Sequence, residues 1–156
     1  MFKEDAARVG GHLTDDDIRW AGPAIVKKAY RIFQVRGYES KLLAASMRVG
    51  PTIDGQTRIR HIETFAGGTV VLTVFPNIYE AFLTHYADRE IRPQIAEDVP
   101  AATLEKLLKV PYFARAYDED GYAPEEFITH QALIDTRQQF ADAAEQLEAY
   151  IASRMR

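Results

Sequence analysis

The chain has 156 residues, 27% of them charged, with 19 Lys and Arg against 23 Asp and Glu and no cysteine. Its net charge of −4 argues against nucleic acid as the main partner, and no apolar run reaches the roughly 20 residues that span a bilayer. The lack of cysteine excludes a disulfide scaffold, a thiol nucleophile and a zinc–thiolate site. Residues 1–11 lack the apolar stretch of a signal peptide, so we expect one cytoplasmic domain over residues 1–156.

Residues 1–22 form an N-terminal segment with one clear helix start. Thr14 is followed by three aspartates. A capping hydroxyl and carboxylates at the positive end of the helix dipole are typical of a helix N-terminus. We therefore predict a short helix that begins after Thr14 and is interrupted at Gly22. Pro23 then suits the first position of a second helix.

Residues 23–36 are predicted to form an amphipathic helix. Apolar residues recur along one face at helical spacing, and Lys27 and Lys28 lie on the polar face. The apolar residues are Val26, Ala29, Tyr30 and Phe33. We expect Gly37 to end this helix in the left-handed conformation.

Two short apolar runs alternate with helices in the segment 23–90. Residues 41–46 and 69–74 do not alternate in polarity, which is typical of strands covered on both faces and paired in parallel. A helix is predicted over 57–66, and another begins at Pro76. The resulting α-β-α-β-α order predicts a parallel α/β sheet.

Residues 91–156 contain no further strand signal and are predicted to form C-terminal helices. We expect a short helix over 101–109, an irregular stretch over 111–121 and a long helix over 124–154. The long helix has one apolar stripe. Its members are Phe140, Ala144, Leu147 and Ile151.

Two buried parallel strands cannot form a stable sheet alone, because each edge presents unpaired backbone groups. We therefore expect the chain either to associate with copies of itself or to be part of a larger assembly. Exposed apolar patches are expected in both cases.

The first predicted strand ends at Ser46, Met47 and Arg48. Ligands of parallel α/β folds bind beyond the carboxyl ends of the strands. An arginine fork matches phosphate and a serine adds a short neutral donor, so Ser46 and Arg48 are candidate phosphate-binding residues. The alternative is a small residue that closes a strand and a solvated arginine.

Several segments, in this order and spacing, resemble the transaldolase family. Ala29–Arg48 is similar to the family's helix, Gly-Tyr, strand and Ala-Ser-Phe-Arg stretch. His61–Leu83 is similar to its Leu-Ala-Gly and Thr-x-x-Pro run. Trp20–Val26 resembles the entry into the first of these helices, and Pro124–Phe127 with His130 resembles its Glu-x-Glu-Phe-x-x-x-His segment, the histidine standing one position early.

Transaldolases are class I aldolases on an eight-stranded βα barrel. The resemblance implies that the two strands here are the last two of eight, and that the chain is the C-terminal portion of a TIM-type barrel, since a complete one needs about 200 residues. It also implies that Ser46 and Arg48 bind a sugar phosphate. Met47 replaces the family's Phe, and Val49 replaces its Asn.

The family's remaining catalytic segments have no counterpart in this chain. They are the Schiff-base lysine of the fourth strand, an Asp of the first strand, a Glu of the third and an arginine after the sixth. A substitute lysine would need a dry pocket or a cationic neighbour. The six lysines are Lys3, Lys27, Lys28, Lys41, Lys106 and Lys109, and none is a credible nucleophile; Lys41 lies roughly 16 Å from the strand's carboxyl end. We therefore expect no catalytic residue.

Other polar residues give weaker signals. Arg58, Arg60 and His61 either add positive potential near the strand ends or form the solvated face of a helix. The four histidines show no metal-ligand spacing, and we expect neither a metal nor a cofactor.

Three function classes remain open from the sequence. The first is a transaldolase-type protein, whose family transfers a dihydroxyacetone unit between sugar phosphates of the pentose phosphate pathway, inactive alone. The second is a non-catalytic module that binds a sugar phosphate or another anion. The third is an interaction protein whose strand edges pair with copies of itself or with a separate N-terminal portion.

Overall fold

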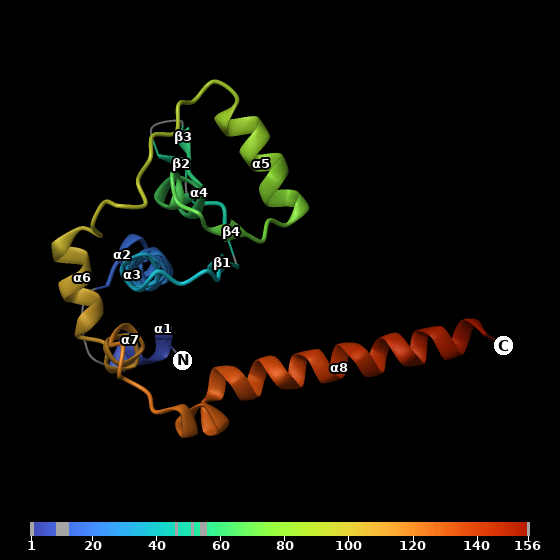
Figure 1. Ribbon diagram of the computed structural model, residues 1–156. Helices are drawn as coiled ribbons and strands as arrows, with labels where there is room; N and C mark the ends of the chain where they lie inside the picture. The colour runs from blue at the N-terminus through green and yellow to red at the C-terminus, as the bar shows by residue number, and fades with distance from the viewer. Residues whose placement is uncertain (1, 9–12, 46, 51, 54–55, 156) are drawn as a thin grey trace. The chain divides into compact units, whose positions relative to one another are not determined.

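The computed structural model describes residues 2–8, 13–45, 47–50, 52–53 and 56–155 (Figure 1). The chain divides into two compact units, Met1–Tyr117 and Asp118–Arg156. The elements of the first unit, in order, are α1 (Phe2–Arg8), α2 (Asp15–Arg19), α3 (Ala21–Arg36), β1 (Leu43–Ala44), β2 (Thr52–Ile53), β3 (Gln56–Thr57), α4 (Arg60–Phe65), β4 (Val71–Leu72), α5 (Pro76–Tyr86), α6 (Ala101–Leu108) and α7 (Pro111–Tyr117). The second unit contains the 3-10 helix η1 (Pro124–Thr129) and α8 (Gln131–Arg154).

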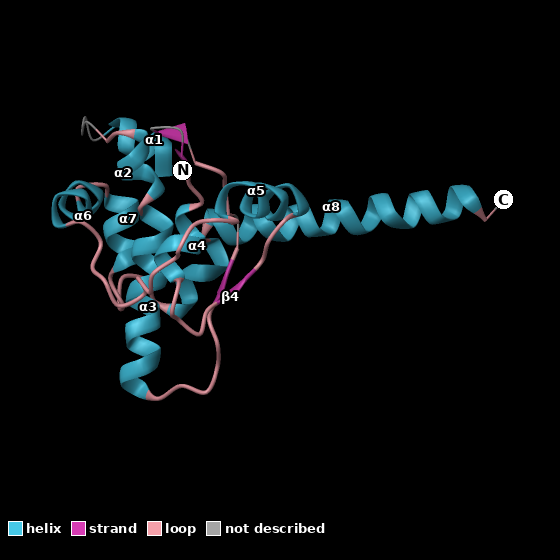
Figure 2. Cartoon of the chain, turned by 90° about the horizontal axis from the view of Figure 1, so that it is seen from above, coloured by secondary structure: helices cyan, strands magenta, loops and turns pink. Residues whose placement is uncertain are grey.

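The first unit is mainly helical, and the predicted partial βα barrel is wrong. Strands β1 and β4 do pair in parallel, with Leu43 opposite Val71, but each is two residues long (Figure 2). Among the described residues neither has a third strand beside it. A barrel strand is covered on both faces, whereas Leu43 is 63% and Val71 46% exposed. One open face is the physical reason why these apolar runs do not continue as barrel strands.

The other face of this strand pair is covered by helices. Ala44 packs with Phe65 of α4 and with Ile95, and Val26 and Tyr30 of α3 lie against the same cluster. The remaining pair, β2 and β3, is a separate antiparallel hairpin within a stretch that the sequence predicted to be loop and helix. The sheet is therefore a small element held against α3 and α4.

The helix boundaries of the first half agree closely with the predicted ones. Helix α2 starts after Thr14, whose hydroxyl accepts a hydrogen bond from the backbone N–H of Asp17, as predicted. Helix α3 begins at Ala21, two residues early, and Gly37 ends it with φ 64°. These local signals were readable because capping and left-handed glycine are decided by neighbouring residues.

Asp17 connects α2 to α6. Its carboxylate accepts hydrogen bonds from the N–H and hydroxyl of Thr14 at 2.9 and 2.8 Å, and from Nζ of Lys106 at 2.9 Å. Thr103 of α6 donates to the other oxygen at 3.3 Å. The hydrogen bond from the backbone N–H of Thr14, followed by the one from the side chain of Lys106, lowers the pKa of Asp17 from 3.8 to about 2. A buried carboxylate is thus fully partnered across two helices.

Lys27 was predicted to lie on the polar face of its helix, and this is wrong: its side chain is 3% exposed. Its Nζ donates to the carbonyl oxygens of Gln94 at 2.5 Å and Glu97 at 2.9 Å. The backbone of Gly67, in the turn after α4, also packs closely against Pro93. A Cβ atom added at Gly67, where φ is 82°, would lie 2.7 Å from Pro93. Residues 93–97 are therefore held against both α3 and the turn after α4.

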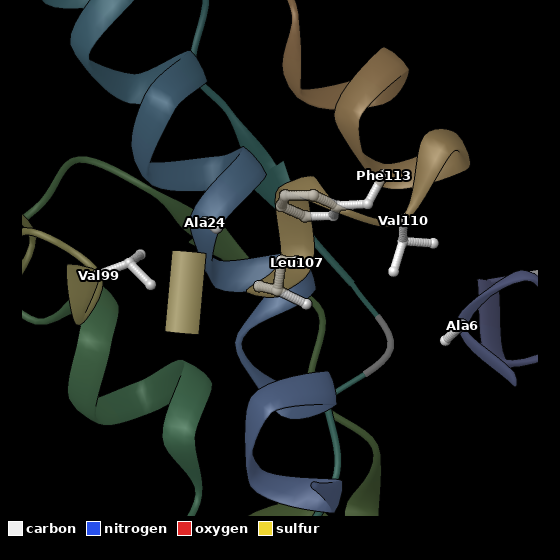
Figure 3. Packing of buried hydrophobic residues seen from close by; sticks show 6 residues of the cluster. All are labelled: Ala6, Ala24, Val99, Leu107, Val110 and Phe113. Atoms are coloured by element: carbon white, nitrogen blue, oxygen red, sulfur yellow. The ribbon is translucent and has the colours of Figure 1, made fainter. Parts of the chain in front are cut away.

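The largest core cluster lies where α3 meets α6 and α7 (Figure 3). Its fully buried members include Leu107, Val110 and Phe113, packed near Ala24 of α3. Phe113 belongs to α7, in the segment that the sequence predicted to be irregular. That prediction was wrong because Pro111 starts the helix, and the burial of Phe113 stabilises a helix whose local pattern is weak.

The second unit contains a break where the sequence predicted one continuous helix. His130 has φ −70° and ψ 121°, an extended conformation between η1 and α8. Tyr122, Phe127 and His130 form a small aromatic cluster with ring centroids 5.0 to 6.2 Å apart. Helix α8 itself is confirmed over most of its predicted length, and none of its residues is buried.

Replacing Asp17 by Asn tests the connection between α2 and α6. We expect Asp17→Asn to lower the free energy of unfolding at neutral pH by about 1.5–3 kcal/mol, since hydrogen bonds to a charged group are lost. Because the folded pKa lies below the unfolded one, this stabilisation is present above about pH 4 and disappears as pH falls through about 2. Urea unfolding followed by circular dichroism at several pH values measures it.

Asp15→Asn is the matched control, because Asp15 is exposed in the same helix. Equal effects of the two substitutions at neutral pH, or a difference that does not shrink towards pH 2, would contradict the assignment.

Candidate anion-binding site

Of the two predicted phosphate-binding residues, Ser46 lies outside the described residues and Arg48 is exposed in the loop between β1 and β2. Its neighbour Met47 is buried in a second core cluster with Ile59 and Ile78. Met47 therefore anchors the backbone at this point, whereas Arg48 is exposed.

Arg48 lines an open pocket with a volume of about 550 Å³. The lining residues are Arg19, Met47, Arg48, Val49, Phe75, Asn77 and Ile78. Two arginines are present and no acidic residue is among them. The size suits a small ligand, and the charge suits an anion.

The residues that the structure describes do not neutralise the two arginines of the pocket. Neither Arg19 nor Arg48 has a hydrogen-bond or ion-pair partner among the residues that the structure describes. Most other arginines of the unit pair with carboxylates. These pairs are Arg31 with Asp98, Arg58 with Glu63, Arg60 with Asp16, Arg89 with Glu63 and Arg92 with Glu97. The contrast concentrates uncompensated positive charge at this pocket.

The N-terminus of α5 also lies at the pocket, through Phe75, Asn77 and Ile78. Phe75 is the N-cap residue and offers no side-chain acceptor, and Pro76 occupies the first turn. Pro76 has no N–H, and the N–H of Ile78 donates to the carbonyl of Phe75, so the first turn contributes the N–H of Asn77 and the helix dipole to the attraction for a negative group.

A buried hydrogen-bond network holds the segment that follows β3, and the loop that carries Arg48 is joined to this segment by a hydrogen bond from the N–H of Gly50 to the carbonyl of Arg58 at 2.7 Å. Tyr86 of α5 accepts a hydrogen bond from the backbone N–H of Ile59 at 2.7 Å and donates to Oε1 of Glu63 at 2.7 Å. Arg89 contacts the same carboxylate at 3.2 Å and donates to the carbonyl of Thr57 at 2.8 Å. Burial is the main reason why the pKa of Tyr86 is raised.

The cluster of Arg58, Arg60 and His61 does not lie at this pocket. Arg60 forms an ion pair with Asp16 and covers the ring of Trp20, while Arg58 is exposed. The Nδ1 atom of His61 is buried without a hydrogen-bond partner, and burial lowers the pKa of this histidine. The predicted solvated face therefore describes Arg58 but not His61.

No lysine lines the arginine pocket. A smaller pocket of about 190 Å³ is lined in part by Lys27, Lys28 and Arg31. All three are already partnered, because Lys28 donates to the carbonyl of Tyr117 and Arg31 pairs with Asp98. Burial lowers the pKa of Lys27, but its ammonium is held by two carbonyl oxygens.

In the described part of the chain, no group of three or more His, Asp or Glu side chains is placed to hold a metal ion. No helix among the described residues is long and apolar enough to cross a membrane. Comparison of the chain with protein-family models, with characterised proteins and with solved structures finds no match.

Arg19 is the site residue that sequence reasoning missed. It lies 29 residues before Arg48 and, in sequence, is one charge at the end of a short helix. Tertiary packing brings it to the pocket: α2 contacts α3 and α6, and Asp16 of α2 pairs with Arg60 of α4. Arg19 stands out because no described carboxylate pairs with it, and this can be read only from the folded structure.

Replacing Tyr86 by Phe tests whether the hydrogen bonds of Tyr86 with Ile59 and Glu63 hold the segment after β3. We expect Tyr86→Phe to lower the free energy of unfolding by about 1–3 kcal/mol, because the buried N–H of Ile59 loses its acceptor. Urea unfolding measures the change. Tyr79→Phe is the control, since Tyr79 is exposed on the same helix. A loss of stability in Tyr79→Phe as large as in Tyr86→Phe would argue against the network.

Proposed function

We propose that the chain binds a phosphorylated sugar at the Arg19–Arg48 pocket and performs no aldol chemistry by itself. The observation that carries the proposal is that two arginines line one pocket and that, among the described residues, neither has an acidic partner and no acidic residue lines the pocket. The cysteine-free composition fits a reducing compartment, and we propose the cytoplasm.

The chemistry of the pocket favours a phosphate monoester. A dianion offers acceptors to two guanidinium groups, and charge-assisted hydrogen bonds of this kind are the stronger ones. The first turn of α5 supplies one further donor, the N–H of Asn77, because Pro76 has no N–H and the N–H of Ile78 donates to Phe75. Phe75 and Ile78 line the same pocket and offer apolar surface to the carbon skeleton of the ligand.

The resemblance to transaldolases supports a sugar phosphate over other phosphate compounds. In that family the residues matched by Ser46 and Arg48 bind the phosphate of the substrate. The chain has no counterpart of the family's Schiff-base lysine, and its arginine pocket has no lysine. We therefore propose the family's phosphate recognition without its covalent step.

Phosphate binding is tested by titration calorimetry with fructose 6-phosphate and with inorganic phosphate. We expect saturable binding that weakens as salt rises, since exposed charges are screened. Arg48→Ala and Arg19→Ala should each weaken binding by roughly tenfold or more, because a hydrogen bond to a charged group contributes about 1.5–3 kcal/mol. Arg48→Lys should also bind less tightly than the wild type, since a point charge does not replace a fork.

Arg58→Ala is the matched control, an exposed arginine of the same unit that does not line the pocket. It should leave the affinity unchanged. No saturable binding, or equal losses in Arg58→Ala and Arg48→Ala, would contradict the proposal.

The absence of covalent catalysis is tested by borohydride reduction in the presence of fructose 6-phosphate. We expect no adduct on any lysine, because the only buried one, among the described residues, is hydrogen-bonded to two carbonyl oxygens. Peptide mass mapping reads out the result, with an active transaldolase as positive control. An adduct on Lys27 would show that a desolvated lysine acts as the nucleophile.

A further inference from the structure

Helix α8 has no buried residue, yet apolar side chains recur along one face. These residues are Leu133, Phe140, Ala144, Leu147 and Ile151. The separations of seven, four, three and four residues follow the heptad pattern of paired helices. Phe140 is 73% and Leu147 59% exposed. A single helix of this kind is marginal in water without packing, so the stripe needs a cover.

Two opposite charges on the same face lack partners. Arg137 occupies the heptad position between Leu133 and Phe140, and Glu148 borders Leu147. Neither forms an ion pair with another described residue. They are 11 residues apart, about 16 Å along the helix, which is too far to pair within it. Unlike Glu148, the acidic residues Asp135 and Asp142 on the outer face of the helix have partners, because each accepts a hydrogen bond from a glutamine.

We propose that α8 pairs with α8 of a second copy of this chain, antiparallel and centred near residue 142. In that register Leu133 lies opposite Ile151 of the second copy, and Phe140 lies opposite Ala144. Arg137 then lies beside Glu148 of the second copy, and the two-fold axis repeats each contact. This single register places the large Phe140 against the small Ala144 and the positive Arg137 beside the negative Glu148.

Other pairings of the same stripe are less favourable. A parallel pair places Phe140 against Phe140, leaves a gap at Ala144 and brings two Arg137 side chains together. An antiparallel pair centred half a heptad further along brings Arg137 opposite Arg154. Like charges at such positions oppose association. The charge pattern therefore selects both the orientation and the register.

The test uses the full chain and sedimentation equilibrium. Arg137→Glu alone and Glu148→Arg alone should each raise the dimer dissociation constant at least tenfold, because each places like charges side by side. An equimolar mixture of the two variants should associate again as a heterodimer, since every glutamate then meets an arginine. Circular dichroism confirms that both variants keep their helix content.

Phe140→Glu should abolish dimerisation. Gln146→Glu adds the same charge on another face of α8 and should leave dimerisation unchanged. A wild-type chain that stays monomeric, a mixture that does not associate, or single variants that associate like the wild type would each overturn the proposal. The last outcome would assign the association to the open strand edges, and the first would indicate that α8 packs within its own chain.

Discussion

The buried ammonium of Lys27 connects the parts of the first unit that no β-ladder connects. It donates to the carbonyls of Gln94 and Glu97, while the N–H groups of Gln94 and Ile95 donate to the carbonyl of Ala66. One side chain thereby joins α3, through residues 94–97, to the turn that leads into β4. Because each strand is two residues long, few ladder hydrogen bonds exist, and contacts from side chains to backbone position the elements instead.

The arginine pocket depends on the same kind of contact. Its residues come from α2, from the loop after β1 and from the first turn of α5. Asp17 fixes α2 to α6, and Tyr86 holds the backbone of Ile59, in the segment after β3 to which Gly50 of the Arg48 loop is hydrogen-bonded. Each of these contacts involves a side chain of a helix, Lys106 of α6 or Tyr86 of α5, so the backbone segments that bear Arg19 and Arg48 are held in place from nearby. Preorganised backbone lowers the ordering cost of binding, although each arginine still loses side-chain freedom.

The sequence predicted the capped helices α2 and α3 well, but it missed α7 and the break at His130 and predicted the sheet poorly. Caps such as Thr14 and Gly37 are set by residues within one turn, and the structure has both where they were predicted. Strand length depends on neighbours far away in sequence, and the apolar runs carry no information on whether these are present. The burial of Lys27 and the approach of Arg19 to Arg48 likewise depend on long-range packing. Arg48 was predictable only as a candidate, because nothing local distinguishes it from a solvated arginine.

The net charge of the chain does not describe the charge at the arginine pocket, because the charges are unevenly compensated. The total of −4 suggests no affinity for anions. Yet carboxylates such as Asp16, Asp17 and Glu63 form ion pairs with basic side chains. The residues described as lining the pocket include two arginines and no acidic residue. Exposed charges act over about 8 Å at physiological salt, so a ligand at the pocket would experience these two arginines, the end of α5 and the nearby aspartates of α2 far more than the rest of the chain's charge. The local pairing of charges decides what this surface attracts.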